Sequence, residues 1–162
     1  KIELYLPPRS GRMHALRMIR ELLAFEPKGR GTDINAALQE TSRLMKKRGV
    51  VFLLSDLIEP EKFAASLRIL KAKQDVVAIE LSDPSDESFP LNNRITFEDA
   101  ETGEIVEYDG NADILNEELK KVQDEKVAVC RRAGTDLIKV DCGSDVLKPL
   151  IGFFAERQKH LR

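Results

Sequence analysis

Val50-Val51-Phe52-Leu53-Leu54-Ser55-Asp56 and Val76-Val77-Ala78-Ile79-Glu80-Leu81-Ser82-Asp83 are the two stretches that decide the fold of this chain. Both begin with an apolar run that opens on β-branched valines, which is typical of parallel strands covered on both faces. Both end at a Ser-Asp pair. Between them, Glu59-Pro60-Glu61 suits the first turn of a helix. The helix would bury Phe63, Leu67 and Leu70 on one face. This order of strand, helix and strand predicts a parallel sheet.

The alternation continues toward the carboxyl end. A charged helix is predicted over residues 113–132, because Gly134 suits its C-terminal cap and its apolar positions fall at helical spacing. Those predicted core positions are Leu115, Leu119, Val122 and Val129. Residues 136–140 predict a further strand, and the segment from Val146 to Phe154 predicts a terminal helix. Residues 94–108, with a turn at Gly103, predict an inserted β-hairpin that forms an exposed excursion.

The sequence that precedes these two strands predicts one further strand and two amphipathic helices. Residues 2–6 alternate apolar and polar side chains like a half-buried strand, and Pro7-Pro8 ends them. Helical spacing begins at Arg12 and again at Ile34. We therefore expect a single α/β domain over residues 1–162, with a mostly parallel, doubly wound sheet of the Rossmann-type three-layer kind.

Composition narrows the classes of function. The chain has 162 residues, 33% charged and 42% hydrophobic, and a net charge of -2, so no long-range positive field favours nucleic-acid binding. Its longest apolar run, residues 50–54, is far shorter than the ~20 residues that span a bilayer. Cys130 and Cys142 lack metal-ligand spacing. This predicts a reducing, cytoplasmic setting in which both are small core residues.

Chemistry is expected where the predicted strands end. Asp56, Asp83 and Asp141 each follow a strand, and Thr32 lies at a helix entrance. Ligands of open parallel sheets bind at the carboxyl ends of the strands. Asp, Ser and Thr are also the residues that favour helix N-caps, and we interpret Asp83 and Asp141 as helix caps. A hydroxyl and a carboxylate on adjacent loops suit Mg²⁺, so Thr32 and Asp56 are candidate metal ligands. Beside them lie the candidate interaction residues Gly31, Asp33 and Ser55.

Two sets of motifs resemble known families. Gly31-Thr32-Asp33-Ile34-Asn35-Ala36-Ala37-Leu38, followed by residues 50–56, resembles the second and third metal loops of a von Willebrand factor A-type domain. Three further stretches resemble the bacterial domain-of-unknown-function family 58. They are Pro8-Arg9-Ser10-Gly11-Arg12, Leu22-Leu23-Ala24-Phe25-Glu26-Pro27-Lys28-Gly29-Arg30-Gly31-Thr32-Asp33 and Lys148-Pro149-Leu150-Ile151-Gly152-Phe153-Phe154. The resemblance covers nearly the whole chain and agrees with the α/β pattern.

The resemblance implies a metal-ion-dependent adhesion site. In such sites an Asp-x-Ser-x-Ser loop after the first strand, a Thr and an Asp hold the ion. Thr32 and Asp56 match the last two, whereas this chain contains no Asp-x-Ser-x-Ser. The resemblance therefore implies that the chain is the carboxyl portion of a domain whose first strands lie upstream of Lys1. The metal site would then be incomplete here, and self-association of the chain is expected.

Three functions remain open. The resemblance favours a non-enzymatic, Mg²⁺-dependent protein-interaction module that works with an AAA+ ATPase of the MoxR type in protein maturation or assembly. The first alternative is a metal-dependent phosphoryl-transfer or hydrolytic enzyme in which Asp56 and Asp83 form a carboxylate pair. No nucleophile signature or basic phosphate motif accompanies that pair, so no catalytic residue is assigned. The second alternative is a metal-free structural or regulatory α/β domain.

Overall fold

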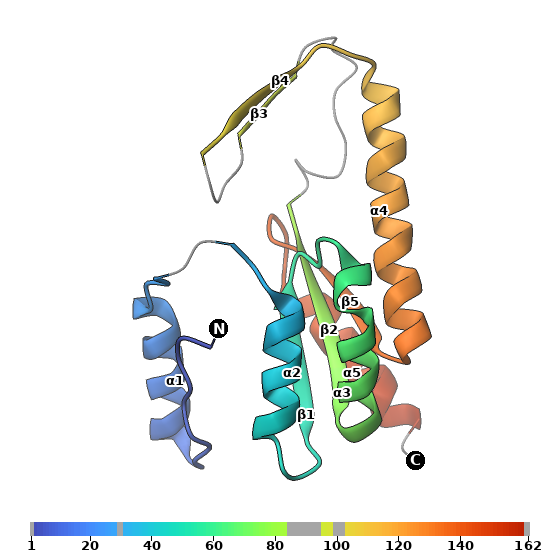
Figure 1. The fold of residues 1–162 in the computed structure, drawn as a ribbon. Coiled ribbons are helices and arrows are strands. Elements are labelled where there is room, and N and C mark those ends of the chain that lie inside the picture. The colour runs from blue at the N-terminus through green and yellow to red at the C-terminus, as the bar shows by residue number, and fades with distance from the viewer. Residues whose placement is uncertain (1, 29–30, 84–94, 99–102, 161–162) are drawn as a thin grey trace.

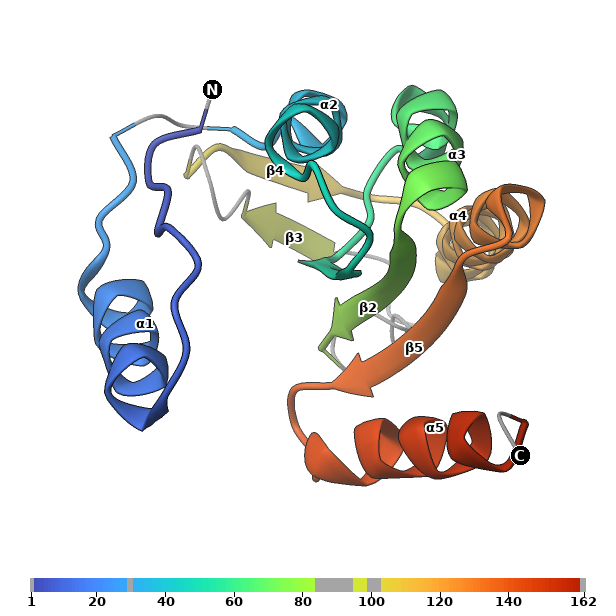
Figure 2. The same ribbon diagram turned by 90° about the horizontal axis from the view of Figure 1, so that it is seen from below.

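The central feature is a three-stranded parallel sheet with helices on both faces. The structure is a computed structural model, and it describes residues 2–28, 31–83, 95–98 and 103–160. The strand order is β1-β2-β5, with β1 at Val50–Ser55, β2 at Asp75–Ser82 and β5 at Asp136–Asp141. Helices α2 (Ile34–Leu44), α3 (Ala64–Lys73) and α4 (Ala112–Ala133) cover one face, and α5 (Leu147–His160) covers the other (Figures 1 and 2). The predicted α/β class and parallel, doubly wound sheet are confirmed.

Strand β2 is the central strand, and its side chains alternate between two cores. Val76 and Ala78 point into the larger core beneath α2, α3 and α4, together with the predicted helix positions Phe63, Leu67 and Leu70. Val77 and Ile79 point into a smaller core, which Leu150 and Phe153 of α5 help to close. The apolar run 76–79 therefore has the two-sided burial that its pattern predicts.

Strand β1 departs from that prediction because it lies at the edge of this sheet. Among the described strands it pairs with β2 alone. Val51 and Leu53 pack against the larger core. On the other face, Val50, Phe52 and Leu54 are 51%, 44% and 59% exposed. Helix α5 contacts this face through Phe154, whose ring centroid lies 6.0 Å from that of Phe52. The expectation that residues 50–54 are covered on both faces is wrong for this structure.

The amino-terminal segment also differs from its pattern. Residues 2–6 contain no strand, since none of the described strands pairs with them. Helix α1 (Arg12–Ala24) is present as predicted, but none of its residues is buried. Figures 1 and 2 both show α1 standing apart from the sheet and from the other helices. A segment with alternating apolar and polar residues forms a strand only if a neighbouring strand hydrogen-bonds with it.

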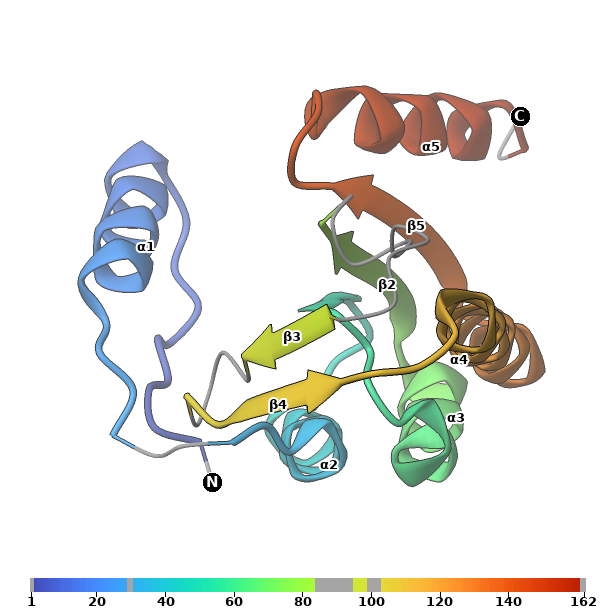
Figure 3. The ribbon, with the colours of Figure 1, turned by 90° about the horizontal axis from the view of Figure 1, so that it is seen from above.

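The predicted hairpin forms its own sheet. Strands β3 (Ile95–Glu98) and β4 (Ile105–Tyr108) pair with each other antiparallel and are not joined to the main sheet. They lie beyond the carboxyl ends of the main strands, as Figures 1 and 3 show. Residues 94 and 99–102 of the predicted hairpin lie outside the described residues.

Helix α4 is longer than the sheet that it packs against. Its 22 residues span about 33 Å, whereas a six-residue strand such as β5 spans about 20 Å. Of the four predicted core positions only Val129 is buried. Leu115 and Leu119 are half-buried and Val122 is exposed, because the first half of the helix projects past the sheet (Figure 1). Gly134 caps the helix in the left-handed conformation, as predicted.

Two smaller expectations are corrected near the carboxyl end. Cys130 is buried on α4, but Cys142 is exposed just after β5 and so is not a core residue. Helix α5 runs to His160, beyond the predicted end at Phe154. Pro149 is accommodated as its third residue, because the first turn of a helix needs no backbone N–H donor there. The three-residue helix η1 (Pro60–Lys62) precedes α3, where Glu59-Pro60-Glu61 predicted a helix start.

Candidate functional site

The candidate residues gather at one end of the sheet. Because β1, β2 and β5 are parallel, Asp56, Asp83 and Asp141 all come where their strands finish. Figure 1 shows that α2 begins at the same end, so Thr32 and Asp33, which precede α2, also lie there. We call this end of the sheet the carboxyl rim. It is the end at which parallel α/β sheets bind ligands.

The loop after β1 is tightly held. The Ser55 hydroxyl donates to a carboxylate oxygen of Asp56 at 3.1 Å and accepts from the Leu57 backbone N–H at 3.1 Å. Leu57 and Glu59 have φ angles of 55° and 51°, in the left-handed region that residues other than glycine rarely adopt. The fully buried Leu57 side chain anchors the loop in the core, while its neighbour Ile58 is 61% exposed. The loop thus holds Asp56 and Ile58 in fixed positions at the rim.

The loop before α2 has a clear structural role. The Asp33 carboxylate accepts from the backbone N–H of Ala36 at 2.8 Å and so caps the helix. Gly31 has a φ of 85°, which a residue with a side chain would adopt only with strain. These two residues, predicted to belong to an interaction surface, here fix the course of the chain around Thr32. Asp141 is also used locally, since its carboxylate accepts from the Gly143 N–H at 2.7 Å.

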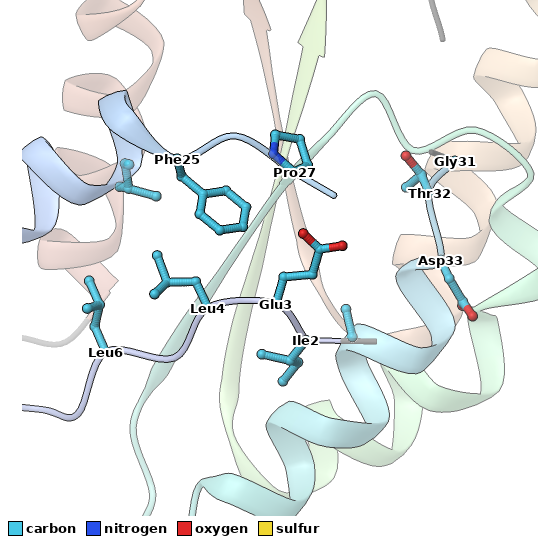
Figure 4. Close-up of a pocket in the computed structure, with 11 residues that line it drawn as sticks. Ile2, Glu3, Leu4, Leu6, Phe25, Pro27, Gly31, Thr32 and Asp33 are labelled. Atoms are coloured by element: carbon cyan, nitrogen blue, oxygen red, sulfur yellow. The ribbon is translucent and has the colours of Figure 1, made fainter. Parts of the chain in front are cut away.

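The two predicted metal ligands line different hollows. Thr32 lines one of about 880 Å³, whose apolar wall comes from the amino-terminal segment and the end of α1, with Leu4 and Phe25 among its residues (Figure 4). Asp56 lines another of about 480 Å³, together with Asp83. Asp56 and Asp83, the carboxylate pair of the enzyme alternative, therefore do share a hollow.

The oxygen atoms of Thr32 and Asp56 suit a hard cation such as Mg²⁺, but two ligands do not fill its coordination shell. A hydroxyl and a carboxylate are oxygen ligands of the kind that Mg²⁺ takes. Among the described residues, no three His, Cys, Asp or Glu side chains come together in a group that could hold a metal ion. Thr32 and Asp56 by themselves do not fit a tightly bound ion, so no chemical step is assigned to a metal in this chain.

A buried ion pair that the sequence pattern did not indicate lies beneath the rim. Glu80 is 1% exposed. Its carboxylate accepts from Lys126 Nζ at 2.8 Å and from Gln123 Nε2 at 3.0 Å, both on α4. The available signal was an acidic residue inside the apolar run of β2, because a charge in such a place needs a partner. The identity of that partner, 46 positions away, could not be read from the pattern.

The Cys130 thiol of α4 is not activated. Burial, with a smaller contribution from the charge of Glu80, raises the pKa of Cys130 to about 11. The thiol therefore stays protonated at neutral pH and is a poor nucleophile.

Together these features define a class of protein: an α/β domain with a polar carboxyl rim built from the loop after β1, the entrance to α2 and the adjoining end of β2. The chain belongs to the family described as "Protein of unknown function DUF58", whose model matches residues 1–128. This confirms the family predicted from the motifs.

The relatives are mycobacterial. Uncharacterized protein Rv1480 of Mycobacterium tuberculosis (strain ATCC 25618 / H37Rv) and uncharacterized protein Mb1516 of Mycobacterium bovis are each 26% identical over 159 residues. The match covers 95% of this chain and 50% of each of them, so the chain spans about half their length. Uncharacterized protein MAV169 of Mycobacterium avium is 25% identical, with 95% and 94% coverage. No solved structure matches the chain. None of the helices in the described residues is long and apolar enough to cross a membrane.

Proposed function

We propose that this chain is a non-enzymatic protein-interaction module of von Willebrand A type, which binds a partner at its carboxyl rim with the help of Mg²⁺. The observation that carries the proposal is the loop after β1. Two left-handed residues and the buried Leu57 hold it in one conformation, and it presents the Asp56 carboxylate beside the exposed Ile58. Backbone strain of this kind is concentrated at functional sites.

The roles of the residues follow from their chemistry. Asp56 offers a carboxylate that the Ser55 hydroxyl orients, and Thr32 offers a hydroxyl from the entrance of α2. When bound, Mg²⁺ supplies positive charge that an acidic group of the partner would meet. The remaining ligands come from outside this chain, since two oxygens leave most of an octahedral shell open.

An AAA+ ATPase of the MoxR type is the proposed partner, in maturation or assembly of other proteins. The support for this step is the family resemblance together with the membership in the DUF58 family. Because such a partner uses ATP, the proposed encounter takes place in the cytoplasm.

The test is a pull-down of the ATPase by the protein, with Mg²⁺ and with a chelator. We expect recovery in Mg²⁺, and loss of it with the chelator and in Asp56→Ala. The matched control is Asp141→Asn, a change at the end of β5, which β2 separates from β1. Its side chain can still accept the hydrogen bond from Gly143. Recovery that is indifferent to both the chelator and Asp56→Ala would contradict the proposal.

A first prediction concerns this chain by itself. With Thr32 and Asp56 as the available ligands, we expect Mg²⁺ in the millimolar range to leave the melting temperature unchanged, because ligands stabilise a fold only in proportion to their affinity for it. Thermal unfolding with Mg²⁺, and again after addition of a chelator, measures this. A rise of several degrees that the chelator reverses would show that other residues complete a site.

The enzyme alternative gains one observation, the shared hollow of Asp56 and Asp83. Its test is hydrolysis of p-nitrophenyl phosphate in Mg²⁺ by the wild type and by Asp83→Asn. Turnover that Asp83→Asn abolishes would favour the enzyme over the interaction module.

A further inference from the structure

The hollow at the carboxyl ends of β2 and β5, beneath α4, has the form of a small-molecule site. Its volume of about 480 Å³ falls within the range of ligand pockets, roughly 300–1,000 Å³. Its floor is polar, because Glu80 lies there almost fully buried with its charge balanced by Lys126. Because Lys126 already neutralises Glu80, a ligand would be recognised by the other residues that line the hollow.

The walls of this hollow carry opposite charges. Asp56 and Asp83 line it at the ends of β1 and β2. Lys120 of α4 and Lys139 of β5 line it from the other elements, and both are exposed. Lys139 is paired in register with Glu80, which places it on the face that α4 covers. A ligand that fits both walls has an anionic group at one end and hydrogen-bond donors at the other.

Ser82 is the second, independent observation. Its hydroxyl oxygen is buried and has no hydrogen-bond partner within the part of the chain that the structure describes. Ser82 lines the hollow, two residues after Glu80 on the same face of β2. An unmet buried hydroxyl costs about 1–3 kcal/mol, and such groups in folded proteins call for a water or a ligand.

We propose that this hollow binds a small molecule that carries a phosphate or carboxylate group and hydroxyl groups. The anionic group lies against Lys120 and Lys139, where ammonium groups meet its oxygens. A hydroxyl of the ligand bonds to the Ser82 Oγ atom. The site needs no metal and does not use Thr32, and although it shares Asp56 with the proposed partner-binding rim, ligand binding here does not depend on partner binding there.

The experiment is lysine labelling of the protein with acetic anhydride in metal-free buffer, read residue by residue by mass spectrometry. The probes are glycerol 3-phosphate and glycerate, which share hydroxyl groups and differ in the anion. We expect labelling of Lys120 and Lys139 to fall about tenfold once the better probe is about ten times above its Kd, because labelling follows the unoccupied fraction. Lys121 is the internal control, since it neighbours Lys120 on α4 but does not line the hollow.

Two variants separate the site from general anion binding. Ser82→Ala folds, because the hydroxyl that it removes has no partner, and it should raise the half-protecting concentration about fivefold. Ser144→Ala, whose exposed hydroxyl donates to the Asp141 carbonyl, should leave that concentration unchanged. Protection by sodium chloride at matched ionic strength, or equal protection of Lys121, would show an adventitious ion only. That result, or an unchanged value for Ser82→Ala, would overturn the proposal.

Discussion

Glu80 carries the most demanding charge in the described structure. A carboxylate removed from water is unfavourable unless it is both paired and hydrogen-bonded. Lys126 supplies the pair and Gln123 a second hydrogen bond, and both come from the half of α4 that packs against the sheet. This ion pair therefore ties the long helix to the central strand directly below the rim.

We predict that Lys126→Met destabilises the fold by about 3 kcal/mol, because it leaves Glu80 buried without its countercharge. The exposed pair of Lys121 and Glu118 on the same helix is the control, and Lys121→Met should leave the free energy of unfolding nearly unchanged, because solvent screens an exposed pair. Urea unfolding followed by circular dichroism gives both values. Equal changes in the free energy of unfolding for the two substitutions would show that the buried pair stabilises the fold no more than the exposed pair.

Helix α5 is tied to the sheet at the end opposite the rim. Arg157 donates to Asp75 at 2.7 Å and lies 3.2 Å from a carboxylate oxygen of Asp136, at the first residues of β2 and β5. Its guanidinium group also sits 5.2 Å from the centroid of the Phe153 ring. Lys71 of α3 reaches Asp75 from the other face at 3.0 Å. These contacts join helices from both faces through one carboxylate.

That carboxylate should give the fold a measurable acid sensitivity. The Arg157 hydrogen bond, with help from Lys71 and against the effect of burial, holds the pKa of Asp75 below its ordinary value of 3.8. A lowered folded-state pKa adds stability that is present above the unfolded-state pKa and is lost as the pH falls through the folded-state value. As the pH falls from about 5 through the lowered folded-state pKa of Asp75, the wild type should lose more stability than Asp75→Asn, by an amount that solvent screening of the partly exposed pair keeps small. Parallel curves of unfolding free energy against pH would contradict this.

Element types were predictable from the sequence, whereas their burial depended on neighbours. The apolar runs 50–54 and 76–79 have the same local pattern, yet only β2 lies between two strands. Helical spacing in α4 was correct, but spacing does not tell how far a helix extends past the sheet. At the site, Thr32 and Asp56 were correctly placed at the rim, because topology fixes where strands end. The contact of Glu80 with Lys126 and the unmet Ser82 hydroxyl depend on tertiary packing that no local pattern encodes.

At the scale of the whole molecule, the described structure leaves two apolar surfaces uncovered. One is the outer face of β1 with its free edge, and the other is the apolar side of α1, where Leu22 and Leu23 are strongly exposed. A free edge presents unpaired N–H and C=O groups to any other chain. Such surfaces favour association in solution.

We therefore predict that this chain alone dimerises, swaps elements or aggregates, whereas a longer form of the protein that supplies a neighbour for β1 is better behaved and more stable. The physical reason is that a neighbouring strand would cover the edge and the exposed face of β1. Size-exclusion chromatography with light scattering and urea unfolding, on both forms at equal concentration, measures this. A monodisperse monomer with a cooperative transition from the short chain would mean that the sheet is complete as it stands.

Calorimetric titration of the MoxR-type ATPase into a longer form of the protein that supplies a neighbour for β1, in Mg²⁺, tests the proposed rim most sharply. We predict saturable binding that Thr32→Ala and Asp56→Ala each weaken at least about tenfold, the loss of one charge-assisted contact. Asp33→Asn should bind like the wild type, because asparagine also caps the start of α2. Unchanged affinity in both Thr32→Ala and Asp56→Ala would remove the rim and its metal from the mechanism.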